Sequence, residues 1–89
     1  MERHVNIKIH GMVQGVFFRY SAKEQADTLG ITGFARNENG GTVYIETEGE
    51  EKQLEKFLEW CKKGPPYAKV EKLDVTEGEL KNFPKFSTH

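Results

Sequence analysis

A short loop bracketed by two glycines and followed by an arginine is the part of this chain best suited to chemistry. Gly11 and Gly15 allow positive φ, so N–H groups in this stretch can turn inward and form a concave site for an anion. Arg19 follows, and its planar guanidinium can bind two oxygens of a phosphate or carboxylate at once. The capping-box residues Ser21 and Glu24 predict that a helix begins just beyond, with the positive end of its dipole near the loop.

This loop pattern also has an ordinary interpretation. Glycines near an arginine occur in simple strand-to-helix turns that carry a surface arginine. A nucleotide-binding P-loop is excluded, because that motif requires a lysine after its second glycine, whereas Val16 follows Gly15 here. The loop alone therefore indicates an anion site without identifying the anion.

Two motifs in the sequence resemble the two signatures of the acylphosphatase family. The first contains the glycine loop and the arginine: Gly11-x-Val13-Gln14-Gly15-Val16-x-Phe18-Arg19. The second contains a strand-like segment and three later positions: Gly33-Phe34-Ala35-Arg36-Asn37, Gly41-x-Val43 and Gly49. Because both motifs occur in the family's order, the chain is identified as similar to a small stand-alone acylphosphatase, with one domain over residues 1–89.

The resemblance implies an enzyme that hydrolyses acyl phosphates to a carboxylate and inorganic phosphate, with no metal or other cofactor. Arg19 matches the family's phosphate-binding arginine. The family's phosphate cradle corresponds to the backbone N–H groups of Gln14, Gly15, Val16, Phe17, Phe18 and Arg19. Asn37 matches the residue that orients the attacking water, although an asparagine before a hairpin is otherwise typical of a turn. A catalytically silent anion-binding module with the same fold is the alternative.

Two features depart from the family's pattern. Phe17 stands where the family often has a small residue, and this change would alter the rim of the pocket. The tail from Lys85 to His89 lacks a clear aromatic-rich strand, which puts stability in doubt. The motifs address the phosphate and leave the physiological acyl group open.

Hydrophobic periodicity predicts strands at residues 4–11, 31–37, 42–48 and 69–76, and a short final strand within 83–88. Helices are predicted from the capping box to Leu29 and over residues 50–63. This order predicts an α+β fold, the ferredoxin-like βαββαβ sandwich, in which two helices cover one face of an antiparallel sheet. In the last long strand, Leu73 and Val75 are predicted to point inward. The resemblance implies the same fold.

Composition narrows the possible functions and locations. The net charge of −1 lacks the basic excess of a general nucleic-acid binder. No apolar run approaches the roughly 18 residues that span a membrane, and the single cysteine cannot form an internal disulfide. We therefore expect a cytoplasmic location. The resemblance implies a small-molecule acyl phosphate as substrate, with inorganic phosphate or sulfate as a product or analogue; a monomer is expected, although the sequence leaves the oligomeric state open.

The remaining candidate residues favour structural roles. His4 and His10 lie about 20 Å apart along a strand, too far to bind one metal, and are predicted to be solvated. Cys61 lies on the apolar stripe of the second helix and is predicted to be a core residue. Phe34 and Tyr44 could stack on RNA bases, but the full aromatic motif of RNA-binding domains is missing.

Overall fold

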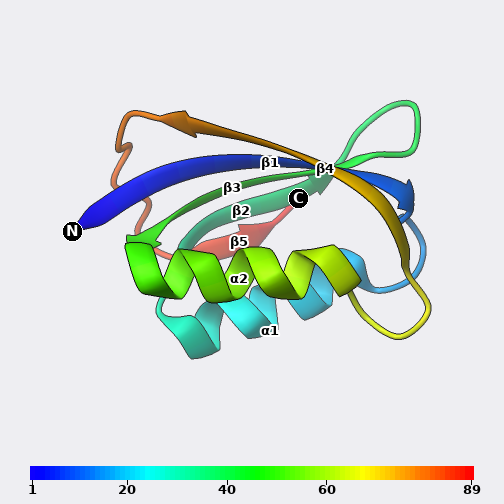
Figure 1. The fold of residues 1–89 in the computed structure, drawn as a ribbon, viewed down its shortest axis with the longest axis horizontal. Coiled ribbons are helices and arrows are strands. Elements are labelled where there is room, and N and C mark those ends of the chain that lie inside the picture. Colours follow the sequence, from blue (N-terminus) through cyan, green and yellow to red (C-terminus); the bar gives the residue numbers. More distant parts are fainter.

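The molecule has two layers, a five-stranded sheet and two helices that cover the same face of the sheet (Figure 1). The computed structural model describes residues 1–89. In chain order the elements are β1 (Glu2–Met12), α1 (Phe18–Leu29), β2 (Thr32–Asn37), β3 (Val43–Glu50), α2 (Glu51–Lys63), β4 (Lys69–Gly78) and β5 (Phe86–Thr88). The strands are ordered β4-β1-β3-β2-β5 across the sheet. The predicted ferredoxin-like order of elements is confirmed.

The sheet is mixed, because the short β5 adds one parallel pair to the predicted antiparallel sheet. Gly33 of β2 pairs in parallel with Phe86 of β5, whereas all other strand pairs are antiparallel. β4 ends at the end of the sheet where β2 begins, and residues 79–85 cross that end before β5 starts. β5 therefore runs in the direction of β2. Phe86 is 1% exposed, so the tail contributes one side chain to the core.

The sheet face that meets the helices carries the predicted alternating apolar residues. The sheet contributes Val5, Ile7, Ile9, Val43 and Ile45, and the helices contribute Ala22, Ala26, Leu54, Phe57 and Cys61. Burial also raises the pKa of the Cys61 thiol, which opposes formation of a nucleophilic thiolate. The prediction that Cys61 is a core residue is confirmed.

The outer strand β4 is less buried than predicted. Leu73 packs against the core, and Val75 pairs with the buried Ile7 and so faces the helix side as predicted, but Val75 is 46% exposed. β4 forms an edge of the sheet, and the helix layer leaves part of it in solvent.

Helix α1 begins earlier than the capping box predicts. Its first residue is Phe18, and the Ser21 N–H already donates to the Phe17 carbonyl at 3.0 Å. Phe18 is buried against Trp60, with ring centroids 5.3 Å apart, and this packing holds the first turn on the core. The capping-box prediction is therefore wrong, because a tertiary contact starts the helix directly at the loop.

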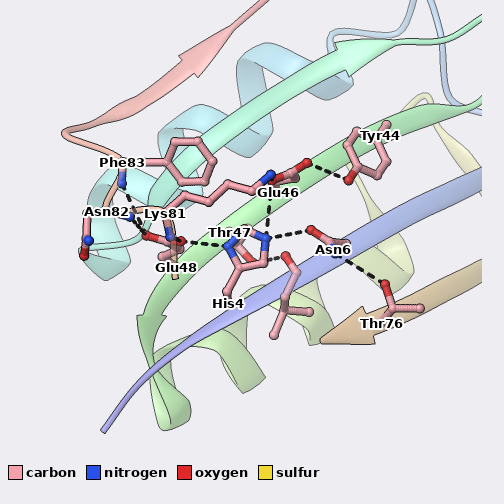
Figure 2. A network of polar contacts seen from close by, with 11 residues as sticks. His4, Asn6, Tyr44, Glu46, Thr47, Glu48, Thr76, Lys81, Asn82 and Phe83 are labelled. Atoms are coloured by element: carbon pink, nitrogen blue, oxygen red, sulfur yellow. Dashed lines mark hydrogen bonds and ion pairs between the residues drawn. The ribbon is translucent and has the colours of Figure 1, made fainter. Parts of the chain in front are cut away.

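The other face of the sheet carries a polar cluster around the buried His4 (Figure 2), which we call the His4 cluster: His4, Asn6, Glu46, Glu48 and Lys81. His4 Nδ1 lies 2.7 Å from a Glu48 oxygen, and Nε2 lies 2.8 Å from Asn6 Oδ1. His4 is 2% exposed, because the segment that crosses toward β5 covers this face. The prediction that His4 is solvated is wrong, whereas His10 remains partly exposed beside Asp74.

The Glu48 carboxylate accepts hydrogen bonds from several backbone N–H groups. The N–H groups of Lys81, Asn82 and Phe83 all donate to it. Burial alone would raise the pKa of Glu48, but these bonds and the one to His4 outweigh burial and lower that pKa. The carboxylate thus fixes the crossing segment over the sheet.

We expect Glu48→Gln to lower the free energy of unfolding at pH 7 by about 1.5–3 kcal/mol, because hydrogen bonds to a buried charge are lost. The folded pKa of Glu48 is lowered, so its stabilisation is present above the unfolded pKa and disappears as pH falls through the folded pKa. Urea unfolding of both proteins should show a difference at pH 7 that shrinks in acid. Exposed Glu55→Gln is the control, and a pH-independent difference for Glu48→Gln would contradict this account.

Candidate active site

The chain turns sharply between β1 and α1, and this loop forms one wall of the candidate site. Gly15 (φ 73°) and Phe17 (φ 63°) have left-handed backbone conformations, which can aim successive peptide N–H groups into one concavity. The N–H groups of Phe18, Arg19 and Tyr20 open α1 and have no intrahelical acceptor. The loop therefore combines backbone donors with the positive end of a helix dipole, an arrangement that suits an anion.

Gly11 has a different role from Gly15. It lies within β1, at an irregularity where the pairing with β4 shifts register after His10. A Cβ at Gly11, whose φ is 128°, would lie 2.0 Å from the carbonyl oxygen of Lys69. Gly11 therefore permits the close approach of β4, while Gly15 turns the loop itself.

A cleft of about 330 Å³ separates the loop from the ends of β2 and β5. Its lining combines loop and helix residues with two residues from strand ends: Val13, Gly15, Phe17, Phe18, Arg19, Tyr20, Asn37 and Thr88. Arg19 and Asn37, which lie far apart in the sequence, thus line one cleft. Arg19 is the only charged residue in the lining, so a bound anion meets a positive charge and no carboxylate.

The Arg19 side chain is oriented by the residue that follows β5. Its Nη1 donates a hydrogen bond to the backbone oxygen of His89. The His89 N–H in turn donates to the carbonyl of Ala35 in β2, at 2.9 Å. The guanidinium is therefore held relative to the sheet, and no spacing in the sequence could have indicated this contact.

Asn37 is the last residue of β2 and pairs with Val43 across the β2–β3 hairpin. Asn37 is exposed at the cleft, and its side chain makes no hydrogen bond within the protein. A turn-forming asparagine would use its side chain to bind nearby backbone. The Asn37 amide is instead available to a ligand or a water molecule.

Comparison with known proteins decides the family of this chain. The family model described as acylphosphatase matches residues 5–88. The chain belongs to the acylphosphatase family. An acylphosphatase from Acaryochloris marina is 47% identical over 78 residues, which cover 88% of this chain and 84% of that protein. An acylphosphatase from Ligilactobacillus salivarius is 44% identical over 86 residues and 96% of both chains.

The fold agrees with that of solved acylphosphatases. The crystal structure of the acylphosphatase from Bacillus subtilis superposes with a TM-score of 0.95 at 38% identity, covering 100% of this chain and 99% of that one. The resemblance inferred from the two motifs is confirmed for the family and for the fold.

The Gln14 side chain has a contact that the motifs did not predict. Its Nε2 donates to the carbonyl oxygens of Glu38 and Thr42, at 2.8 and 2.9 Å. These two residues close the β2–β3 turn, where the Glu38 N–H donates to the Thr42 carbonyl at 2.9 Å. Gln14 thus connects the loop to the turn that directly follows Asn37.

Two of the predicted loop residues pack their side chains against the core. Val16 packs against the hydrophobic core, and the Phe18 ring is buried on Trp60. In this acylphosphatase fold, these residues can therefore offer an anion only their backbone groups, which is the role that the family resemblance implies for them. Their side chains keep the loop on the core.

The structure contains no group of three or more His, Cys, Asp or Glu side chains placed to hold a metal ion. The positive charge at the cleft comes from Arg19 and from backbone dipoles. The donors at the cleft are thus of the kind that bind phosphoryl oxygens directly.

Neither helix has the length and apolar character that crossing a bilayer demands.

Proposed function

We propose that this chain hydrolyses acyl phosphates, with the phosphoryl group held by the backbone N–H groups of residues 14–19 and by Arg19. The observation that carries the proposal is the cleft that brings the loop, Arg19 and Asn37 together without a carboxylate. Membership in the acylphosphatase family supports the same reaction. Inorganic phosphate is then a product, and sulfate is an analogue of it.

The reaction needs positioning and charge stabilisation more than acid catalysis. Water attacks phosphorus in line, the bond from phosphorus to the acyl oxygen breaks, and the carboxylate departs with the electron pair. Arg19 and the loop N–H groups stabilise the charge on the equatorial oxygens. The carboxylate is a weak base, so it leaves without a proton.

Asn37 orients the attacking water through its free amide. An amide does not accept a proton near neutral pH, so Asn37 cannot serve as the general base. The proton of the attacking water passes to a phosphoryl oxygen of the substrate, which becomes inorganic phosphate. The chain's own groups therefore bind and orient, and the substrate supplies the base.

We further propose that the enzyme works as a cytoplasmic monomer, without a metal and without nucleic acid as a partner. The net charge of −1 and a single buried cysteine support this setting. The positive charge of Arg19 takes the place that a metal ion has in other phosphoryl-transfer sites.

A hydrolysis panel tests this function. We expect turnover of benzoyl phosphate and acetyl phosphate, no turnover of ordinary phosphomonoesters, and no change after exhaustive treatment with EDTA. Phosphomonoesters resist because an alkoxide leaves far less readily than a carboxylate. Binding of phosphate without any turnover would establish the silent anion-binding module instead, and activity that EDTA removes and a divalent ion restores would overturn the metal-free mechanism.

Gln14 provides a test of how the two sides of the site are aligned. We expect Gln14→Met to fold and to lose about ten- to hundredfold in kcat/KM, because a small misplacement of reacting groups is costly. The control is Gln53→Met, which removes a similar side-chain bond, from Gln53 to the Leu29 carbonyl at 3.2 Å, outside the cleft. Equal kinetics for both variants would show that the Gln14 contacts do not align the site.

A further inference from the structure

Two exposed aromatic rings stand at the cleft. Phe17 is 75% exposed and Tyr20 is 62% exposed, and both line the same cleft as Arg19 and Asn37. Phe17 ends the loop, and Tyr20 lies in the first turn of α1. Neither ring belongs to the hydrophobic core. Packing within the protein therefore does not explain these two aromatic residues.

The backbone conformation of Phe17 is also unusual. Phe17 has φ 63° and ψ 25°, a left-handed conformation that is unfavourable for a bulky residue and free of strain for glycine. The exposed ring gains little burial to offset that strain. Strained residues of this kind concentrate at functional sites, so the ring of Phe17 calls for a functional explanation.

The direction of the reaction places the acyl group near these rings. In-line attack puts the water and the departing carboxylate on opposite sides of phosphorus. Asn37 and Thr88 line the cleft from the sheet, whereas Phe17 and Tyr20 line it from the loop and α1. With the water held by Asn37 on the sheet side, the acyl group extends away from the sheet, toward the rings.

The charges at the cleft limit which acyl groups fit. The phosphoryl group uses Arg19, the only charged residue of the lining, so a second negative charge on the acyl group finds no partner there. The next cation along α1, Lys23, is already paired with Asp27 at 2.7 Å. The surroundings of the acyl group are therefore aromatic and without a free positive charge.

We propose that Phe17 and Tyr20 form an acyl-binding rim that selects uncharged acyl groups with an apolar, above all aromatic, surface. This specificity rests on the proposed hydrolysis of acyl phosphates and adds the acyl class to it. Aromatic rings contact each other favourably through offset or edge-to-face packing. A small acyl group such as acetyl does not reach the rim.

The test compares kcat/KM for three substrates: benzoyl phosphate, acetyl phosphate and 4-carboxybenzoyl phosphate. The leaving carboxylates differ somewhat in basicity, so binding of the acyl group is reported by the change in the substrate ratio from wild type to variant. We expect benzoyl phosphate to exceed both others by about three- to tenfold, the range expected of one or two ring contacts. Tyr20→Ser keeps the backbone N–H of this position and removes the ring, so it should lower the benzoyl-to-acetyl ratio of kcat/KM by about three- to tenfold.

Tyr67→Ser is the matched control, since Tyr67 is 81% exposed and does not line the cleft. Phe17→Ala is the second variant; its backbone belongs to the loop, so both rates can fall, and the readout is a lower benzoyl-to-acetyl ratio. If the wild-type enzyme hydrolyses acyl phosphates with equal kcat/KM for benzoyl and carboxybenzoyl groups, or both rim variants keep the wild-type ratio, the rim is overturned while the proposed function stands. Absence of all turnover would overturn the proposed function itself.

Discussion

Arg19→Lys lowers kcat/KM for benzoyl phosphate by about 10²–10³-fold, the loss seen when one well-placed donor to transition-state charge is removed. Lysine keeps the positive charge but lacks the planar fork that binds two phosphoryl oxygens at once. It also lacks the second nitrogen that would let one group hold His89 while another faces the cleft. Steady-state kinetics with circular dichroism on the purified variant measure the effect.

Arg36→Lys is the control for this substitution. Arg36 lies on β2, outside the cleft, where its guanidinium stacks 4.9 Å from the centroid of the Tyr44 ring. We expect nearly native kinetics from this variant. Nearly native turnover and substrate affinity in Arg19→Lys would mean that a simple positive charge suffices and that the geometric argument is wrong.

Asn37→Asp and Asn37→Ala both give folded and nearly inactive proteins. If position 37 acted as a general base, Asn37→Asp should match or improve the native rate, because a carboxylate accepts a proton far better than an amide does. If the amide only orients water, the same substitution should lower the rate. A new negative charge close to the phosphoryl group opposes binding by roughly 4 kcal/mol at about 4 Å and an effective dielectric of 20, before screening. Both changes also remove the N–H donors of the amide.

Turnover of one acyl phosphate by the two variants, with circular dichroism to check folding, decides between an orienting residue and a base. Asn39→Asp is the control, because it makes the same chemical change at an exposed position in the adjacent turn that does not line the cleft. A highly active Asn37→Asp enzyme, matching or exceeding the wild type, would identify position 37 as a base site.

Local patterns were sufficient to predict most of the elements. Strands β1 to β4 and helix α2 lie within two residues of their predicted bounds, because alternation with period two and an apolar stripe with helical spacing are properties of neighbouring residues. The left-handed backbone at Gly15 is likewise a local property. The motifs then predicted the family, and the fold brings Arg19 and Asn37 to one cleft as that family resemblance requires.

Contacts between distant segments could not be predicted in the same way. The start of α1 depends on the packing of Phe18 against Trp60, which comes from the other helix. The burial of His4 depends on the crossing segment near Lys81, whose N–H donates to Glu48. In both cases the contacting residue lies far away in the sequence, so no local pattern contains it. The prediction that α1 begins at the capping box and the prediction that His4 is solvated were therefore both wrong.

Residue types and spacings alone specify the chemical groups available at the candidate site, which are the loop N–H groups, one guanidinium and one amide, and the order of the strands and helices that carry them. How those groups are held depends on contacts that form only in the folded chain. Gln14 binds the turn after Asn37, and Arg19 binds His89, whose N–H donates to β2. The physical reason is that residue types and short spacings specify local backbone and available donors, whereas the aim of a side chain depends on acceptors that folding brings from elsewhere in the chain.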